Sequence, residues 1–109
     1  MNENIVLTES TFYILLSLVY PRHGYGIMQE VEKMSNGRVR LRAGTLYGAL
    51  NALSEKRWIR QLPAEPGSRK KEYAITQEGL AALRAESDRL NELASNAATV
   101  LGGLEDGRA

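Results

Sequence analysis

The 109-residue sequence has no cysteine, one histidine and an aromatic content of only 6%. Without cysteine there is no disulfide scaffold, thiol catalysis or cysteine-ligated metal, and His23 alone cannot form a multi-histidine metal centre. The longest apolar run, Phe12 to Tyr20, is much shorter than the roughly 20 residues that cross a bilayer. Glu3 and Glu9 lie where a signal peptide would carry positive charge. We therefore expect a soluble, cytoplasmic protein of about one domain, with no cofactor, no metal and no membrane partner.

The sequence also lacks the residue sets that enzymes need. It has no paired histidine and carboxylate constellation, no glycine loop of the kind that cradles phosphate and no set of metal ligands. Because catalytic sites are built from such groups, the sequence does not predict an enzyme.

Charge is distributed unevenly along the chain, although the net charge is only +1. Residues 20–71 carry eleven basic and four acidic side chains, a net charge of +7, whereas residues 1–19 and 72–109 carry −2 and −4. A basic middle is typical of a unit that binds a polyanion. Chance clustering of charges on solvated faces would give the same partition.

Apolar residues at three- and four-residue spacing predict three helices in the first half of the chain. The first follows the N-cap Thr8 and ends at Pro21, because the residue before proline disfavours helix. The second runs from about Gly24 to about Ser35, and the third from about Ala43 to about residue 57.

The spacing then changes to that of strands in residues 58–62 and 71–76. Pro66 and Gly67 suit the central positions of a type II turn between them, so we expect a two-stranded hairpin with a mobile tip. Thr76 is placed to cap a last helix over residues 77–101, followed by a disordered tail at 102–109.

The predicted last helix has an apolar seam that repeats every seven residues. So small a domain cannot bury this seam, so we expect it to pair with the same helix of a second copy and with the first helix in a twofold homodimer. The alternative is that the helix folds back on its own domain. The expected interface residues are Phe12, Leu16, Leu80, Leu83, Leu90, Ala94, Ala97 and Leu101.

The order of these elements predicts a mainly α fold with a two-stranded β-hairpin. It is that of a winged helix-turn-helix over residues 6–76, extended by a C-terminal dimerisation helix. A small α+β domain that happens to share this order is the alternative.

Four segments carry a family resemblance: LT at residues 7–8 with YIL at 13–15, HGYGI at 23–27, GTLYGALNAL at 44–53 and RKKEYAITQEG at 69–79. Together they resemble the PadR family of bacterial transcriptional regulators, in its compact subfamily with a single terminal helix. The likeness spans about residues 6 to 100. It implies a dimeric repressor that releases double-stranded DNA when a small-molecule effector or another signal reaches the dimer.

The third helix is the candidate recognition helix. Asn51 is suited to pair with adenine and Thr45 to contact a phosphate or a thymine methyl group. Glycines at 44 and 48 would let the DNA backbone approach closely, although Gly48 is also explained by tight helix packing.

The resemblance further implies that Tyr25 and Tyr47 donate to DNA phosphates; alternatively, their rings are buried at the edge of the core. Basic residues before the third helix and on the wing are suited to phosphate or minor-groove contacts, although a solvated hairpin often carries lysines as well. The candidate DNA-binding residues are Tyr25, Arg38, Arg40, Arg42, Gly44, Thr45, Tyr47, Gly48, Asn51, Arg69, Lys70 and Lys71.

The identity of an effector is not predicted. Multidrug-sensing relatives hold planar ligands beside a tryptophan of the last helix, whereas this chain has Leu90 at about that place and no aromatic residue after Tyr73. The competing function is a winged-helix module that binds a protein partner through the third helix.

Overall fold

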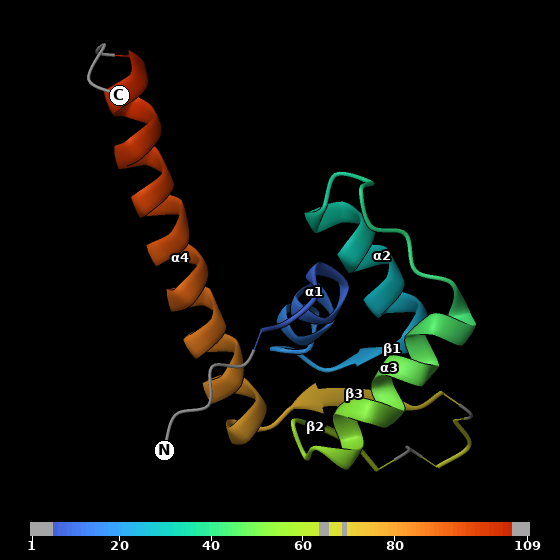
Figure 1. Cartoon of the computed structure of the whole chain (residues 1–109). Helices are drawn as coiled ribbons and strands as arrows, with labels where there is room; N and C mark the ends of the chain where they lie inside the picture. Colours follow the sequence, from blue (N-terminus) through green and yellow to red (C-terminus); the bar gives the residue numbers. More distant parts are fainter. Residues whose placement is uncertain (1–5, 64–65, 69, 106–109) are drawn as a thin grey trace.

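The computed structural model describes residues 6–63, 66–68 and 70–105. Within these ranges, three helices and a small sheet form a winged helix-turn-helix, and a fourth, longer helix leads away from it (Figure 1). The elements are α1 (Glu9–Ser17), β1 (Arg22–His23), α2 (Gly24–Met34), α3 (Ala43–Glu55), β2 (Ile59–Gln61), β3 (Glu72–Ile75) and α4 (Gln77–Glu105).

Helix α1 begins where the sequence predicts but ends earlier. The Thr8 hydroxyl oxygen accepts a hydrogen bond from the Thr11 amide at 3.1 Å, as an N-cap does. The helix stops at Ser17, four residues before Pro21. Its end tightens into a turn, in which the Leu18 amide donates to the Leu15 carbonyl at 3.1 Å and the Val19 amide to the Leu16 carbonyl at 3.4 Å. The Leu18 carbonyl, one of the last that have no partner within the helix, accepts a hydrogen bond from the Ile75 amide of β3 at 2.8 Å.

Helices α2 and α3 agree closely with the predicted bounds. Asn36 (φ 53°) and Gly37 (φ 80°) adopt the left-handed conformation that ends α2. Leu46, Leu50 and Leu53 of α3 are at most 4% exposed, so this helix turns the predicted face to the core.

The sheet has three antiparallel strands in the order β1-β3-β2, not the two strands of the predicted hairpin. Strand β1 was missed because its two residues are too short to show a strand pattern; Arg22 pairs with Tyr73 of β3. In the turn between β2 and β3, Gly67 has φ 84°, as the third position of a type II turn requires.

One core holds α1, α2, α3, the sheet and the first turns of α4 together. Its buried residues come from every helix and from β2 and β3. They are Ile14, Leu15, Leu18, Ile27, Val31, Leu46, Leu50, Leu53, Ile59, Tyr73 and Leu83.

Helix α4 is docked onto the core at its first turn. The Thr76 hydroxyl donates to the Arg57 carbonyl at 2.7 Å and accepts from the Gly79 amide at 3.1 Å, which confirms the predicted cap. Gly79 lies so close to Trp58, the residue before β2, that a Cβ atom there would overlap the Trp58 carbonyl oxygen. Only glycine permits this approach of the two backbones.

Further along α4, Glu86 is buried although it is charged. Its carboxylate accepts hydrogen bonds from the Leu7 amide at 2.8 Å and from Arg89 Nε at 2.6 Å. These two donors, Arg89 first, lower the pKa of Glu86 from 4.5 to about 2, against the opposing effect of burial. The carboxylate therefore joins α4 to the residue just before the N-cap of α1.

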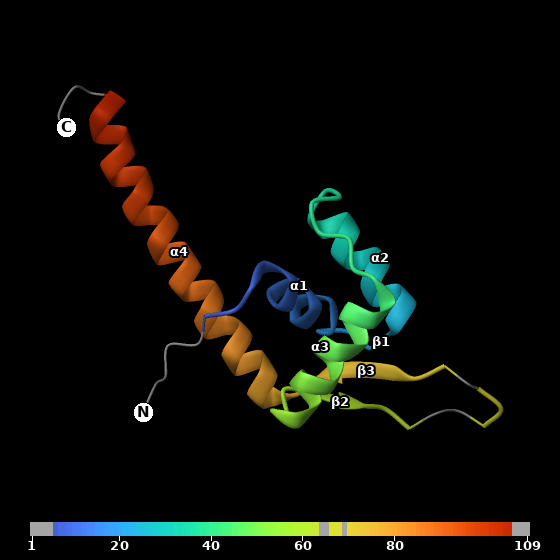
Figure 2. The same cartoon turned by 45° about the vertical axis from the view of Figure 1, so that its right-hand side comes forward.

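Beyond Glu86, α4 projects away from the domain (Figure 2). It continues to Glu105, four residues past the predicted end at residue 101, and so passes through Gly102 and Gly103. Glycine weakens a helix but keeps its amide, so the hydrogen-bond ladder continues where proline would break it. The rest of the predicted tail, residues 106–109, lies outside the described residues.

Replacing Gly79 by alanine should lower the free energy of unfolding by about 1–3 kcal/mol, the usual cost of overpacking. The neighbouring atom is a backbone oxygen, which cannot move aside as a flexible side chain would. Urea unfolding measures the effect. Gly103→Ala is the matched control, because a Cβ there meets nothing within 4 Å; equal effects of the two substitutions would contradict this account.

Glu86 should stabilise the fold in a pH-dependent way. Because folding lowers its pKa, its ionised form contributes stability above about pH 4.5, and this contribution is lost as the pH falls from 4.5 toward 2. Glu86→Gln should therefore lower the melting temperature more at pH 7 than at pH 3, as followed by circular dichroism. The exposed Glu92→Gln should change it little at either pH; an equal loss for Glu86→Gln at both pH values would count against the assignment.

Candidate nucleic-acid interface

The outer face of α3 consists of small, exposed residues. Gly44, Thr45, Gly48 and Asn51 are all exposed, opposite the buried leucines. A Cβ built on Gly44 or Gly48 would meet nothing within 4 Å. Tight packing within the chain therefore does not explain Gly48, and that alternative is wrong. A glycine in a helix costs about 1 kcal/mol relative to alanine, and no close contact with the described residues explains either glycine.

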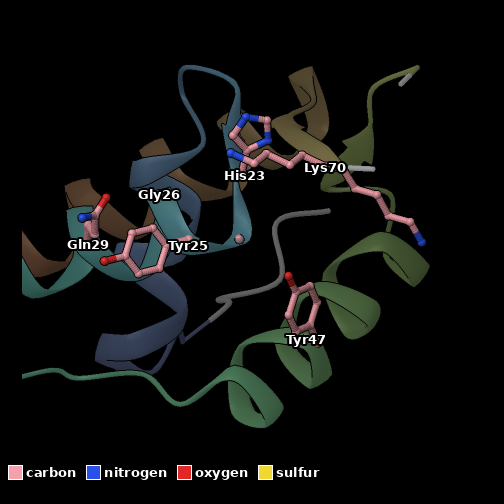
Figure 3. Close-up of a pocket in the computed structure, with 8 residues that line it drawn as sticks. His23, Tyr25, Gly26, Gln29, Tyr47 and Lys70 are labelled. Atoms are coloured by element: carbon pink, nitrogen blue, oxygen red, sulfur yellow. The ribbon is translucent and has the colours of Figure 1, made fainter. Parts of the chain in front are cut away.

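Beside α3 lies an open cavity of about 590 Å³, between the N-terminus of α2 and the start of β3 (Figure 3). It brings together four of the predicted DNA-binding residues: Tyr25 from α2, Tyr47 from α3, and Lys70 and Lys71 from the wing. The remaining lining residues are His23, Gly24, Gly26 and Gln29. Residues from three separate segments therefore share one opening.

The two tyrosines at this cavity differ in burial. Tyr25 is 71% exposed, which rules out a buried ring, whereas Tyr47 is 46% exposed and packs over α2. A Cβ on Gly24 would be 2.5 Å from the Tyr47 hydroxyl oxygen, so Gly24 makes room for that hydroxyl at the N-terminus of α2. Burial of the neighbouring Tyr73 raises its pKa, and the electrostatic effect of Tyr47 raises it further.

The three arginines before α3 line a second hollow, of about 360 Å³, together with Thr45. Arg38 donates from Nε to Glu9 at 2.8 Å, and Arg40 Nε lies 3.4 Å from Glu32. Hydrogen bonding to Glu9 raises the pKa of Arg38 further. The three predicted arginines thus line one hollow, but Arg38 and Arg40 already have acidic partners, which the sequence did not reveal.

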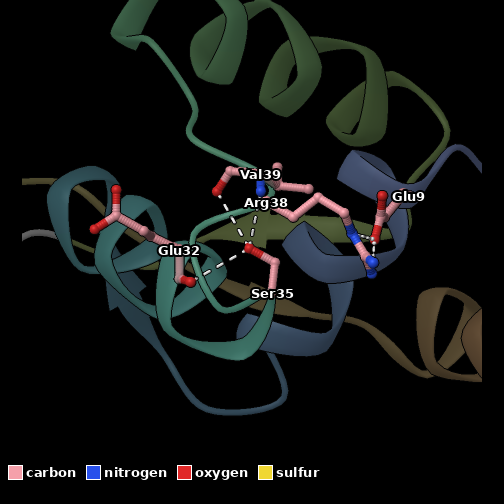
Figure 4. A network of polar contacts seen from close by, with 5 residues as sticks. All are labelled: Glu9, Glu32, Ser35, Arg38 and Val39. Carbon is pink, nitrogen blue, oxygen red and sulfur yellow. Dashed lines mark hydrogen bonds and ion pairs between the residues drawn. The ribbon is translucent and has the colours of Figure 1, made fainter.

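A hydrogen-bonded turn holds the start of this basic segment (Figure 4). The buried hydroxyl oxygen of Ser35 accepts from the Val39 amide at 3.0 Å and lies 3.3 Å from the Glu32 carbonyl oxygen. Arg38 extends from this turn to Glu9 of α1. The path of the chain into α3 is therefore fixed by α1 and α2.

On the wing, Lys70 and Lys71 are exposed, as a role in binding a polyanion requires. Arg69, the third basic residue predicted here, lies outside the described residues.

The predicted dimer-interface residues separate into three groups by burial. Leu83 is 4% exposed and packs in the core of its own chain, so its place in the interface is wrong. Phe12 and Leu80 are half-buried. The others, Leu16, Leu90, Ala94, Ala97 and Leu101, lie on accessible surfaces. Leu104, which continues the predicted seven-residue repeat, is also exposed, as are Leu93 and Val100, which lie outside that repeat.

The outer part of α4 does not fold back. Every residue from Leu90 to Leu101 is exposed, and the helix points away from the other elements in both views (Figures 1 and 2). The alternative in which α4 covers its own domain is therefore wrong.

The described part of the chain contains neither a cluster of metal ligands nor a membrane-spanning helix. No three His, Cys, Asp or Glu residues there are grouped to hold a metal ion. None of the helices described there has the length and hydrophobicity to cross a bilayer.

Comparison with known proteins gives one family and many structures. Residues 14–85 match the model of the Transcriptional regulator PadR-like family. A PadR family transcriptional regulator from Eggerthella lenta is similar with a TM-score of 0.68 and 24% identity, over 84% of this chain and 80% of that chain. A transcriptional regulator from Clostridium thermocellum gives 0.68 and 22%, over 84% and 86%.

A PadR family transcription regulator from Clostridium difficile gives a TM-score of 0.67 and 21% identity, over 84% of this chain and 97% of that chain. At these identities the solved structures support the fold alone. A search of curated proteins gave no significant match.

Gly48→Ala should have opposite effects on stability and on binding. It should raise the free energy of unfolding by about 0.5–1 kcal/mol, because the added methyl group lies in open space on a helix. It should also weaken binding to duplex DNA about fivefold or more, the equivalent of about 1 kcal/mol. Urea unfolding and fluorescence anisotropy measure the two effects. Gly102→Ala, equally open but remote, should leave DNA binding unchanged; unchanged binding by Gly48→Ala would remove Gly48 from the interface.

Proposed function

This chain belongs to the PadR-like family of transcriptional regulators, and on that premise we propose that it is a homodimeric repressor of a pseudo-palindromic operator, released by a small molecule or another signal. The observation that carries the proposal is the outer face of α3, where Gly44 and Gly48 leave open space that the chain itself does not use.

In this proposal α3 enters the major groove. Asn51 pairs with adenine, Thr45 contacts a thymine methyl group or a phosphate, and the two glycines allow the backbone to approach the DNA. The wing lies along the neighbouring backbone, where Lys70 and Lys71 contact phosphates. The shared cavity supports this arrangement, because it is lined by Tyr47 of α3 and both lysines.

Around this contact, the hydroxyl groups of Tyr25 and Tyr47 donate hydrogen bonds to phosphates. Arg42 faces the DNA backbone near the start of α3. Arg38 and Arg40 must exchange Glu9 and Glu32 for phosphate to take part. Arg69 completes the basic wing in the proposal. Binding of duplex DNA requires no cofactor.

The outer half of α4 supplies the dimer contact. Its exposed apolar residues, which include Leu90 and Leu101 of the predicted seam, support pairing with a second copy, which also covers Phe12 and Leu16 of α1. A twofold dimer presents two copies of α3 about 34 Å apart, one turn of DNA.

A small molecule that releases the DNA has a candidate binding site beside the dimer contact. A cavity of about 330 Å³ is lined by Leu7, Glu9, Phe12, Tyr13 and Leu90. Its volume is that of a small-ligand pocket. The proposal places the protein in the cytoplasm with the DNA it regulates.

Selection of bound sequences from random duplex DNA tests the proposal. A pseudo-palindromic sequence with half-sites about one turn apart supports it. Binding of a protein partner through α3, with no duplex selected, would favour the winged-helix interaction module instead.

Lys70→Ala should weaken binding about equally for every duplex and reduce the slope of log affinity against log salt by about one unit, because one phosphate contact is lost. Titrations at several salt concentrations measure this slope. Lys33→Ala, an exposed lysine on the last turn of α2, is the matched control and should retain the wild-type slope. A wild-type slope for Lys70→Ala would exclude Lys70 from the phosphate contacts.

Leu90→Glu should convert the dimer to a monomer, because it places charge in the apolar seam; sedimentation velocity measures the mass. Asn91→Glu introduces the same charge at the neighbouring exposed position and should leave the dimer intact. A dimeric Leu90→Glu variant would mean that the interface lies elsewhere.

A further inference from the structure

Helix α4 is attached to the rest of the chain over its first three turns, where Ala82 and Leu83 are also buried, and a specific contact marks each end of this stretch. The first is its start, where Thr76 bonds to Arg57 and Gly79 contacts Trp58. The second is Glu86, which is 1% exposed and is the last buried residue of the helix within its described length. These contacts at the two ends of the buried stretch, with Leu83 packed in the core between them, set the angle of α4.

The second attachment reaches across the chain to α1. Both oxygens of the Glu86 carboxylate are used: Oε2 accepts from the Leu7 amide at 2.8 Å and from Arg89 Nη2 at 2.8 Å, and Oε1 accepts from Arg89 Nε at 2.6 Å. Leu7 directly precedes the N-cap Thr8, so the carboxylate holds the N-terminal end of α1 against the middle of α4.

A small displacement of α4 at Glu86 becomes a larger displacement at the C-terminal end of the helix. At a rise of about 1.5 Å per residue, Glu86 lies about 10 Å along the helix from Gly79, and Glu105 lies about 28 Å beyond Glu86. A helix that pivots at Gly79 therefore converts a shift of about 1 Å at Glu86 into about 4 Å at its end. The end of α4 is the part left exposed for a second copy.

We propose that Glu86 is a positioning residue that sets the separation of the two recognition helices, and thereby the half-site spacing that the dimer accepts. This inference rests on the proposed homodimer. Because α3 and α1 share one core, fixing α4 against α1 also fixes it against α3. Without the Leu7 contact, α4 is held only at its first turns, and the two copies of α3 lie at variable distances.

A distance measurement tests this without DNA. The chain has no cysteine, so Ser54→Cys, exposed near the end of α3, accepts a single nitroxide label in each copy. Pulsed electron paramagnetic resonance then measures the distance between the two labels, and so between the two α3 helices. The wild-type dimer should give one narrow distribution, and Glu86→Ala a distribution at least about twice as wide.

Two further variants make the comparison specific. Glu86→Gln keeps an acceptor for the Leu7 amide but loses the charge that pairs with Arg89, and should give an intermediate width; it also serves if Glu86→Ala does not fold. Glu92→Gln, exposed on the same helix, should match the wild type. A width equal to that of Glu92→Gln in every folded Glu86 variant overturns the proposal. A wild-type chain with no dipolar signal is monomeric, which overturns the dimer itself.

A DNA measurement gives an independent readout. Duplexes selected with the wild-type protein are lengthened or shortened by one or two base pairs between the half-sites. The wild type should lose about tenfold in affinity per base pair, whereas Glu86→Ala should lose less than about threefold and bind an isolated half-site as the wild type does. Equal weakening on all duplexes would indicate a merely structural role and overturn the proposal. If the wild type selects no duplex, the proposed repressor function fails while the distance measurement still decides the role of Glu86.

Discussion

The burial of one leucine face of α3 is the contact on which the rest of the site depends. Leu46, Leu50 and Leu53 are each at most 4% exposed, and a buried leucine contributes about 1.5–3 kcal/mol relative to an exposed one. Three such residues at helical spacing fix the rotation of α3 about its axis. The opposite face, with Gly48 and Asn51, is consequently turned to the surface, where a second molecule can reach it.

Glycines in this chain serve two different physical needs. Gly24 and Gly79 lie where another part of the chain approaches so closely that a side chain would overlap it. Gly44 and Gly48 lie in open space on α3, where the chain itself gains nothing from their lack of a side chain. The first pair belongs to the architecture, whereas the second pair points to a partner outside the chain.

The basic residues also differ from one another, because some already pair with acidic side chains of the same chain. The basic middle of the chain could be counted in the sequence, but its availability could not. Arg38 and Arg40 are held by Glu9 and Glu32, from α1 and α2, while Lys70 is exposed on the wing. The positive charge available to a partner near the start of α3 is therefore smaller than the count of basic residues in the sequence suggests.

The amino-acid sequence by itself determined the helices, the caps at Thr8 and Thr76, the turn at Gly67 and the outward face of α3, because these depend on residues a few positions apart. Only the tertiary structure decided the bond between Leu18 and Ile75, the pairing of β1 with β3, the burial of Leu83 and the bond between Leu7 and Glu86. Each of these joins residues far apart in the chain, up to 79 positions for the last. Such contacts exist only once the core has brought those segments together, and no local pattern encodes which residues will meet there.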